Sequence, residues 1–240
     1  TGGSKKENVK VTMLTSGQWV IKDVLGFNVK DKSILICSNE LHPLQSNIFK
    51  VRVKDGKRTL LDNGEGVHYG KLSPSGSMLV DSYSSPTVTR NINLTNTVSG
   101  KSVEIFTAEN PWKDYNVPEI TSGSIKAADG VTDLYYRMVK PVDFDPTKKY
   151  PTVIYVYGGP HAHNVEASRN YYARGWEIYM AQKGYLLFIL DNRGSQHRGI
   201  EFENVTHRQL GVEEMKDQME GVKFLKSLPY VDADRMGVHG

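Results

Sequence analysis

The first half of the chain consists of short apolar runs separated by turn signals. The runs that predict strands are Ser33–Ser38, Ser46–Val53, Arg58–Leu61, Met78–Ser82, Thr87–Leu94 and Ser102–Phe106. Turn-forming stretches lie between them, for example Asp55-Gly56 and Ser73-Pro74-Ser75-Gly76. Strands that recur at this spacing with such turns are typical of an all-β sandwich, barrel or propeller.

Two hairpins in this half share one layout. Asn47–Val53 is followed by Arg58–Leu61 across one turn, and Asn91–Leu94 is followed by Val103–Phe106 across another. The second copy comes about 45 residues after the first, which is in the range of one propeller blade. The repeat therefore predicts successive propeller blades, although the pattern by itself leaves a sandwich open.

The pattern changes near Asn110, and the second half mixes strands with helices. Ile120–Ala128 and Thr132–Val139 predict an antiparallel hairpin, because the Asp-Gly pair between them is a strong turn signal. Two continuous apolar runs, Thr152–Tyr157 and Tyr185–Leu190, predict strands that are buried on both faces.

Two segments with helical spacing alternate with these strands. The first, Asn170–Gln182, carries Tyr172, Trp176, Tyr179 and Met180 at that spacing. The second, Val212–Ser227, predicts an amphipathic helix whose apolar side holds Met215, Met219, Val222 and Leu225. Because buried strands that alternate with helices are typical of a doubly wound parallel sheet, we expect such a sheet over residues 111–240. The end of a β-propeller is expected over residues 1–110.

Composition and charge narrow the classes of function. The 240 residues carry a net charge of +3, and the basic residues are dispersed, which argues against nucleic-acid binding. A single cysteine, Cys37, excludes an internal disulfide, and its apolar surroundings predict a buried, inert thiol. No apolar run reaches the length of a membrane helix, so no membrane contact is visible, and Thr1-Gly2-Gly3 does not resemble a signal peptide.

The last residues carry the most informative motif. Arg235–His239 predicts a short buried strand that runs into Gly240, the first glycine of a G-x-S-x-G turn. In α/β-hydrolases this turn, the nucleophile elbow, presents the catalytic serine between a strand and a helix. No complete G-x-S-x-G occurs in the chain. We therefore expect Gly240 to be the first glycine of the elbow, in a chain that stops two residues before its nucleophile and is inactive alone.

A second motif lies after the predicted strand Thr152–Tyr157. Gly158-Gly159-Pro160 stands where α/β-hydrolases have the loop that supplies part of the oxyanion hole, and glycines there let the backbone approach the reacting carbonyl. A tight turn without function is the alternative. The order of strand, loop, helices and elbow favours the functional interpretation, and with it the N-terminal half of an α/β-hydrolase domain over residues 111–240.

Three other groups of candidate residues have simpler explanations. His161 and His163 form an H-x-H pair, but no third ligand at recognisable spacing accompanies them, so we expect a polar loop and no metal site. Arg193 follows a predicted strand, where it could contact substrate, yet a turn pinned by Asp191 and Arg193 is favoured. The acidic residues of the last helix are expected on its solvated side, without a catalytic role. They are Glu213, Glu214, Asp217 and Glu220.

Several motifs occur in the order seen in one family of serine peptidases. They are Val156-Tyr157-Gly158-Gly159-Pro160, Asp191-Asn192-Arg193-Gly194-Ser195, Leu210-Gly211 ahead of Asp217-Gln218, and Val231–Gly240. On these motifs the chain resembles the dipeptidyl peptidase IV branch of the prolyl oligopeptidase family, and within it bacterial dipeptidyl and prolyl tripeptidyl aminopeptidases. The resemblance covers nearly the whole chain and is most specific from Lys149 onward.

The resemblance implies a catalytic role for Tyr157, which matches the family tyrosine whose phenol donates to the tetrahedral oxyanion. It implies an enzyme that releases N-terminal di- or tripeptides after proline or alanine, by serine attack and hydrolysis of an acyl-enzyme. The substrates are then peptides with a free amino terminus, and no cofactor is needed. It further implies a triad that follows the elbow, a whole protein that can form a homodimer, and a periplasmic or otherwise extracytoplasmic location in a bacterium.

Two alternatives stay open. An acylaminoacyl peptidase or a prolyl oligopeptidase-type enzyme shares the hydrolase half but lacks the acidic residues that grip a free amino terminus. A non-catalytic scaffold built from propeller and hydrolase domains is the second alternative. The intact Tyr157-Gly158-Gly159-Pro160 loop argues against that scaffold, because function belongs to the site and not to the fold.

Overall fold

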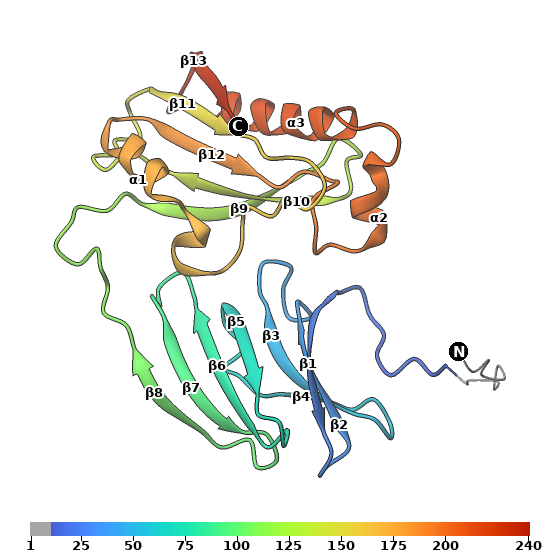
Figure 1. Ribbon diagram of the computed structural model, residues 1–240. Coiled ribbons are helices and arrows are strands. Elements are labelled where there is room, and N and C mark those ends of the chain that lie inside the picture. The colour runs from blue at the N-terminus through green and yellow to red at the C-terminus, as the bar shows by residue number, and fades with distance from the viewer. Residues whose placement is uncertain (1–10) are drawn as a thin grey trace, which may run out of the picture.

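The computed structural model describes residues 11–240, and its strands form three separate sheets (Figure 1). The first ten residues of the predicted propeller segment lie outside the described residues. The strands are β1 (Ile21–Asn28), β2 (Ser33–Ser38), β3 (Asn47–Arg52), β4 (Arg58–Leu60), β5 (Val67–Leu72), β6 (Met78–Ser84), β7 (Asn91–Asn96), β8 (Ser102–Thr107), β9 (Ile120–Lys126), β10 (Asp133–Val139), β11 (Tyr150–Tyr155), β12 (Leu186–Leu190) and β13 (Val231–His239). The helices are η1 (Arg169–Tyr172), α1 (Gly175–Gln182), α2 (Ile200–Glu203), η2 (Asn204–Thr206) and α3 (Glu213–Ser227).

Two four-stranded antiparallel sheets occupy residues 21–107, and in each the strands follow their order in the chain. We call β1 to β4 the first blade sheet and β5 to β8 the second blade sheet. The two hairpins that the sequence singled out are β3–β4 and β7–β8, the last two strands of each sheet. The predicted repeat of one unit is therefore confirmed, and two such sheets side by side have the form of propeller blades.

The sequence pattern missed the first strand of each blade sheet. β1 and β5 lack a continuous apolar run, and each is interrupted by a glycine. At Gly70 of β5 the glycine is needed for packing, because a Cβ there would lie 2.5 Å from Leu25 Cδ1 on β1. The strand expected from Thr87 begins only at Asn91, since the backbone groups of Ser85 and Val88 bond to each other in a turn.

The two blade sheets pack through a shared apolar core. Leu35, Cys37 and Ile48 of the first blade sheet meet Leu79 of the second. Cys37 is 4% exposed, and burial raises the pKa of its thiol to about 11. The prediction that Cys37 is buried is thus confirmed, and the raised pKa agrees with the expected inert thiol.

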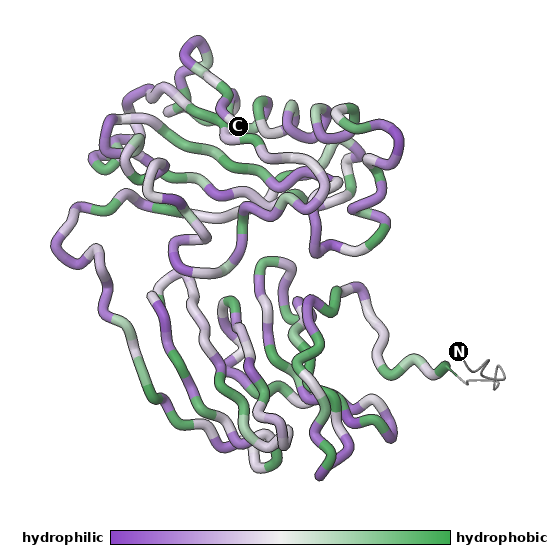
Figure 2. Tube along the Cα trace, in the orientation of Figure 1, coloured by the Kyte–Doolittle hydropathy of each residue, from purple (hydrophilic) through white to green (hydrophobic). Residues whose placement is uncertain are grey.

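The third sheet, which we call the mixed sheet, has the strand order β13-β11-β12-β10-β9. β13, β11 and β12 run parallel, whereas β10 pairs antiparallel with both β12 and β9. The predicted hairpin is β9–β10, and it extends the predicted parallel strands as an antiparallel edge, so the sheet as a whole is mixed. The strand β12 is buried along all five residues and forms an unbroken apolar band in Figure 2.

The last strand, β13, is exposed where the sequence predicted burial. Val238 is 74% exposed, and among the described strands only β11 pairs with β13. The pattern from Arg235 onward correctly predicted a strand there. It could not show that this strand lies at the edge of the sheet, where one side has no neighbour in the described chain.

Helices α1 and α3 cover opposite faces of the mixed sheet (Figure 1). Leu225 of α3 packs with Phe188 in one core cluster, whereas Ala181 of α1 packs with Leu187 and Ile189 in another. Successive side chains of β12 point to opposite faces, so the two clusters lie on the two sides of the sheet. The predicted arrangement of helices on both faces is confirmed.

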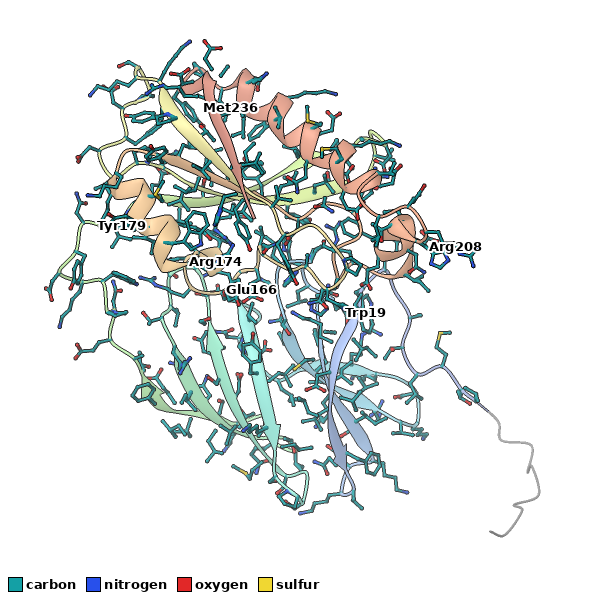
Figure 3. All side chains as sticks on the ribbon, turned by 45° about the horizontal axis from the view of Figure 1, so that its top comes forward. Trp19, Glu166, Arg174, Tyr179, Arg208 and Met236 are labelled. Atoms are coloured by element: carbon teal, nitrogen blue, oxygen red, sulfur yellow. The ribbon has the colours of Figure 1, made fainter. Side chains whose placement is uncertain are left out.

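Helix α1 is shorter than predicted, and of its regularly spaced apolar residues Trp176 and Met180 pack against the core. Asn170–Tyr172 take left-handed φ values between 52° and 67°, and the α-helix begins only at Gly175. Tyr179 has the same helical spacing, but it is 57% exposed and lies on the outer side of the helix in Figure 3. The acidic Glu177 is buried in its place.

Helix α3 has nearly the predicted length, but only Val222 and Leu225 of its predicted apolar side pack in the core. Met215 and Met219, which the pattern placed in the core, are 61% and 46% exposed. Glu214 and Asp217, which it placed in solvent, are buried. The prediction of a solvated acidic side is wrong for these two residues, because the inward face of the helix meets polar partners.

The loop after β11 rests on the blade sheets. The Ala167 N–H donates to the Leu44 carbonyl at 2.7 Å. From the blade side, the Asn39 amide donates to the His197 carbonyl at 2.7 Å. Glu166 of the loop lies between the two halves of the molecule in Figure 3. The mixed sheet and the blade sheets are therefore joined by direct hydrogen bonds.

Candidate active site

The two motifs that carried the sequence analysis meet at one edge of the mixed sheet. β11 and β13 are parallel neighbours with Tyr155 opposite His239, and the Val156 N–H donates to the His239 carbonyl at 2.9 Å. A Cβ on Gly240 would lie 2.1 Å from the Val156 carbonyl oxygen, so only glycine fits there. The loop that the sequence predicted to form part of an oxyanion hole and the predicted first glycine of the elbow thus begin side by side.

Tyr157 lies just beyond the end of its strand. β11 ends at Tyr155, two residues earlier than the apolar run suggested, so Tyr157 belongs to the loop. Its side chain is 57% exposed at the carboxyl edge of the sheet, the edge where ligands of α/β proteins bind.

Two asparagine side chains hold the backbone of this loop. Asn164 Nδ2 donates to the Tyr157 carbonyl at 3.2 Å, and Asn192 Nδ2 donates to the Gly158 carbonyl at 2.9 Å. A Cβ on Gly158 would lie 2.5 Å from Asn192 Oδ1, so the close approach requires the glycine. Neither asparagine was singled out as a site residue, although Asn192 follows β12 directly at the carboxyl edge, which is a usable signal.

Asp191 ties the next part of the loop to the end of β12. Its carboxylate accepts from the Asn164 N–H at 3.0 Å and from the Val165 N–H at 2.9 Å. Burial raises the pKa of Asp191, while the bonds from Asn164 and Val165 and the charge of Arg137 oppose that shift. Asp191 therefore fixes the loop in the manner of a turn-capping residue.

Arg193, the candidate substrate contact, is engaged with carboxylates of this chain. Its guanidinium donates to Asp217 at 2.8 Å, to Glu213 at 3.1 Å and to Asp129 at 3.2 Å. The hydrogen bond with Asp217 is the main cause that raises the pKa of Arg193. The contacts agree with the pinned turn that the sequence favoured over a substrate contact. They also explain why Asp217 is buried on α3.

The histidines near the loop have separate environments. His161 is exposed, whereas His163 packs edge-on against His197 with ring centroids 4.9 Å apart. Burial, with Lys22 and Arg198 nearby, lowers the pKa of His163 to about 4, so its ring is neutral near pH 7. Among residues 11–240, no three or more His, Cys, Asp or Glu side chains are grouped in a way that could hold a metal ion.

Two hollows adjoin the loop. A cavity of about 670 Å³ lies between the blade sheets and the mixed-sheet half, and residues of both halves line it. Its polar and aromatic lining includes Lys22, Tyr69, His163, Glu166, Tyr172 and His197. A smaller hollow of about 370 Å³ lies beside Gly158 and Gly159, and the exposed residues Met215, Met219 and Val238 line it. Met215 and Met219 on the apolar side of α3 thus face this hollow, whereas Leu225 on the same side packs in the core.

No helix in residues 11–240 is both long enough and apolar enough to cross a membrane.

Comparison with known proteins finds similarity along almost the whole chain. Residues 3–90 match the dipeptidyl peptidase IV N-terminal region, and residues 171–240 match the prolyl oligopeptidase family. The chain is 30% identical to dipeptidyl peptidase 8 of Homo sapiens over 247 residues, which cover 95% of this chain and 27% of that protein.

Two solved structures are similar in both sequence and fold. A candidate dipeptidyl aminopeptidase IV from Bacteroides ovatus superposes with a TM-score of 0.91 at 51% identity, over 97% of this chain and 33% of that one. Dipeptidyl peptidase 4 of Porphyromonas gingivalis gives a TM-score of 0.87 at 29% identity, again over 97% and 33%. The chain therefore spans no more than about a third of the length of these relatives.

Proposed function

Because this chain belongs to the dipeptidyl peptidase IV branch of the prolyl oligopeptidase family of serine peptidases, we propose that the full-length protein is a serine exopeptidase. It releases N-terminal di- or tripeptides after proline or alanine. The reaction is acyl transfer, in which a serine attacks the scissile carbonyl and water then hydrolyses the acyl-enzyme. Its substrates are peptides with a free amino terminus, and no cofactor takes part.

The observation that carries the proposal is the meeting of two strand ends. Tyr157 follows β11, and Gly240 ends against Val156 of the neighbouring parallel strand. A serine presented by an elbow at the end of β13 would attack a carbonyl close to the Tyr157 loop. This is the geometry that acyl transfer requires, since nucleophile and oxyanion donor must flank the same carbon atom.

In this proposal Tyr157 donates its phenolic O–H to the oxyanion. Charge appears on that oxygen only in the tetrahedral transition state, so a fixed donor lowers the barrier without tightening the binding of substrate. Loss of one such donor typically raises the barrier by about 3 to 4 kcal/mol. The exposed phenol at the carboxyl edge is free to approach a bound peptide.

The relatives support the exopeptidase assignment. Human dipeptidyl peptidase 8 and Porphyromonas gingivalis dipeptidyl peptidase 4 carry the dipeptidyl activity in their names. The similarity to both extends over at least 95% of this chain and includes the blade sheets as well as the mixed sheet. A relative that shared only the hydrolase fold would match the second half alone.

Cleavage of four chromogenic substrates by the full-length protein tests the proposal. They are Ala-Pro- and Ala-Ala-Pro-p-nitroanilide, each with a free and with an acetylated amino terminus. We expect hydrolysis of the free amines only, and the preferred length then distinguishes dipeptide from tripeptide release. Equal cleavage of the acetylated substrates would support an acylaminoacyl peptidase or a prolyl oligopeptidase-type enzyme. No cleavage of any of the four would support the non-catalytic scaffold.

A further inference from the structure

We propose that Asn164 and Asn192 are positioning residues, which hold the Tyr157-Gly158 backbone so that the Tyr157 phenol meets the oxyanion. The inference rests on the function proposed above. Their side chains bond to two consecutive carbonyls of the loop, Tyr157 O at 3.2 Å and Gly158 O at 2.9 Å. Both asparagines act through Tyr157 and do not touch the substrate themselves.

Asn192 is held in one orientation by its own contacts. The residue is completely buried, and its Nδ2 donates to the Arg193 carbonyl at 2.7 Å as well as to Gly158. Its Oδ1 accepts from Gln218 Nε2 of α3 at 2.9 Å. If the amide were flipped, Oδ1 would face the Gly158 and Arg193 carbonyl oxygens, and Nδ2 would face the Gln218 amide nitrogen. The hydrogen-bond pattern therefore fixes Nδ2 as the atom that faces Gly158.

Asn164 is held in a comparable way. It is 7% exposed, and its Nδ2 also donates to Asp191 Oδ1 at 2.9 Å. Its backbone N–H donates to the same carboxylate at 3.0 Å. Asn164 therefore donates to Asp191 through both its backbone and its side chain, and Asp191 directly follows β12.

Asn164 and Asn192 are both held at the turn of residues 191–193, and helix α3 holds that turn in place. Asp217 accepts from the Arg193 N–H at 2.9 Å, and Gln218 donates to the Leu190 carbonyl at 3.1 Å. A continuous set of hydrogen bonds thus runs from α3 through residues 191–193 to the oxyanion loop.

The loop depends on these bonds because the sheet no longer holds it. β11 ends at Tyr155, one residue before the bond from the Val156 N–H to the His239 carbonyl, and Tyr157 and Gly158 lie in the loop that follows. The two residues after Tyr157 are glycines, which have more backbone freedom than any other residue. An oxyanion donor must be placed to within about half an ångström, so two amides on consecutive carbonyls supply a restraint that the backbone lacks.

A double-mutant cycle in the full-length protein tests the inference. The variants are Asn192→Ala, Asn164→Ala and Tyr157→Phe, with each asparagine variant also made in the Tyr157→Phe background. Rates are measured on Ala-Pro-p-nitroanilide, or on Ala-Ala-Pro-p-nitroanilide if that is preferred. We expect each asparagine variant to lower kcat about 10-fold or more with KM within about 2-fold, because a small displacement of a catalytic group is costly.

In the Tyr157→Phe background we expect the same asparagine variants to lower kcat less than about 2-fold, since the group they position is already lost. Equal losses in both backgrounds would show that the asparagines act independently of Tyr157 and would overturn the inference. So would an unchanged kcat in both single variants. If Tyr157→Phe itself left the rate unchanged, the proposed role of Tyr157 would fail first, and the two failures are therefore distinguishable.

Two further variants guard against a loss of folding. Asn192→Asp keeps the size of the side chain but replaces the donor that faces the Gly158 carbonyl with an acceptor, so the same pattern of losses is expected. Asn116→Ala changes an exposed asparagine far along the chain from the loop and should leave kcat and KM unchanged. Thermal melts of all variants show whether a lost rate reflects an unfolded protein.

Discussion

The blade sheets and the mixed sheet are built on opposite principles. In the blade sheets every strand pairs with its neighbour in the chain, so each sheet is a series of local hairpins. In the mixed sheet β11 lies between β12 and β13, although β12 and the helices from η1 to α3 separate β11 from β13 in the chain. The site proposed for catalysis lies at this non-local junction. Pairing between neighbouring strands builds the blade sheets, whereas pairing between distant strands brings the Tyr157 loop and Gly240 together.

The two regions also bury polar groups differently. In the blades, His68 is paired with Asp81 at 2.8 Å, and the second carboxylate nearby, Asp62, lies at 3.8 Å. In the mixed-sheet half, the fully buried Arg137 and Glu177 form an ion pair at 2.8 Å. Buried charge in that half is concentrated around the loop beside the candidate site, since Arg137 also donates to the Asn164 and Tyr171 carbonyls.

The largest change is expected from Glu177→Gln, which leaves Arg137 as an unpaired buried charge. Breaking a buried pair by removing one partner typically costs about 3 to 5 kcal/mol of unfolding free energy. Urea unfolding followed by circular dichroism measures that loss. The matched control is Glu119→Gln, which breaks the more exposed pair with Lys140 and should cost less than about 1 kcal/mol. Equal losses for the two variants would contradict the difference in burial.

The next largest effect is expected at the two glycines of the oxyanion loop. Gly158→Ala puts a Cβ 2.5 Å from Asn192 Oδ1 and should displace the loop, whereas a Cβ on Gly159 meets nothing within 4 Å. We expect kcat to fall about 10-fold for Gly158→Ala, because catalytic groups tolerate little displacement. Gly159→Ala should change kcat less than about 3-fold. The comparison fails if the two alanines have the same effect on steady-state rates.

The smallest effect expected is a difference in pH dependence between the two regions. The pKa of His163 lies at about 4, below its ordinary value, because burial disfavours the charged ring. The unfolded chain then binds the proton more readily, so stability falls as pH drops below the ordinary histidine pKa toward 4. His163→Gln should flatten this acid slope by roughly 1 kcal/mol between pH 6 and 5.

His68 should behave in the opposite way. Burial lowers its pKa, but the hydrogen bond and charge of Asp81 together with Asp62 outweigh burial, and the net shift is upward. The contribution of His68 to the free energy of unfolding is therefore complete below the ordinary histidine pKa, and it is lost as pH rises through the raised pKa. His68→Gln should flatten the alkaline side of the stability profile, as measured by unfolding midpoints between pH 4 and 9. An acid slope that depends on His68 would contradict this assignment.

The sequence pattern predicted where strands and helices occur better than it predicted which side of each helix is buried. The hairpins β3–β4 and β7–β8 and the strand β12 follow from local turn and apolar signals. The buried faces of α1 and α3 do not, because the buried Glu177 pairs with Arg137 and the buried Asp217 with Arg193, both distant in the chain. A periodicity of apolar residues cannot detect a buried ion pair, so it assigned Asp217 to solvent.

The candidate site could be predicted only in part, because local motifs are visible in the sequence and contacts between distant residues are not. Tyr157 and Gly240 stand out as motifs, and their proximity follows once β11 and β13 are parallel neighbours. The position of Asn192 after β12 is a usable signal, but it does not reveal which carbonyl the side chain binds, and Asn164 carries no local signal. Their contacts exist only because the turn after β12 lies against the loop after β11.

The most direct test of the account is the effect of Tyr157→Phe on the acylation rate of the full-length protein. Pre-steady-state cleavage of the preferred p-nitroanilide separates acylation from hydrolysis of the acyl-enzyme. The account predicts a rate lower by about 100-fold or more, with substrate affinity almost unchanged, because the phenol stabilises charge that exists only in the transition state. A rate like that of the wild type would remove Tyr157 from the mechanism.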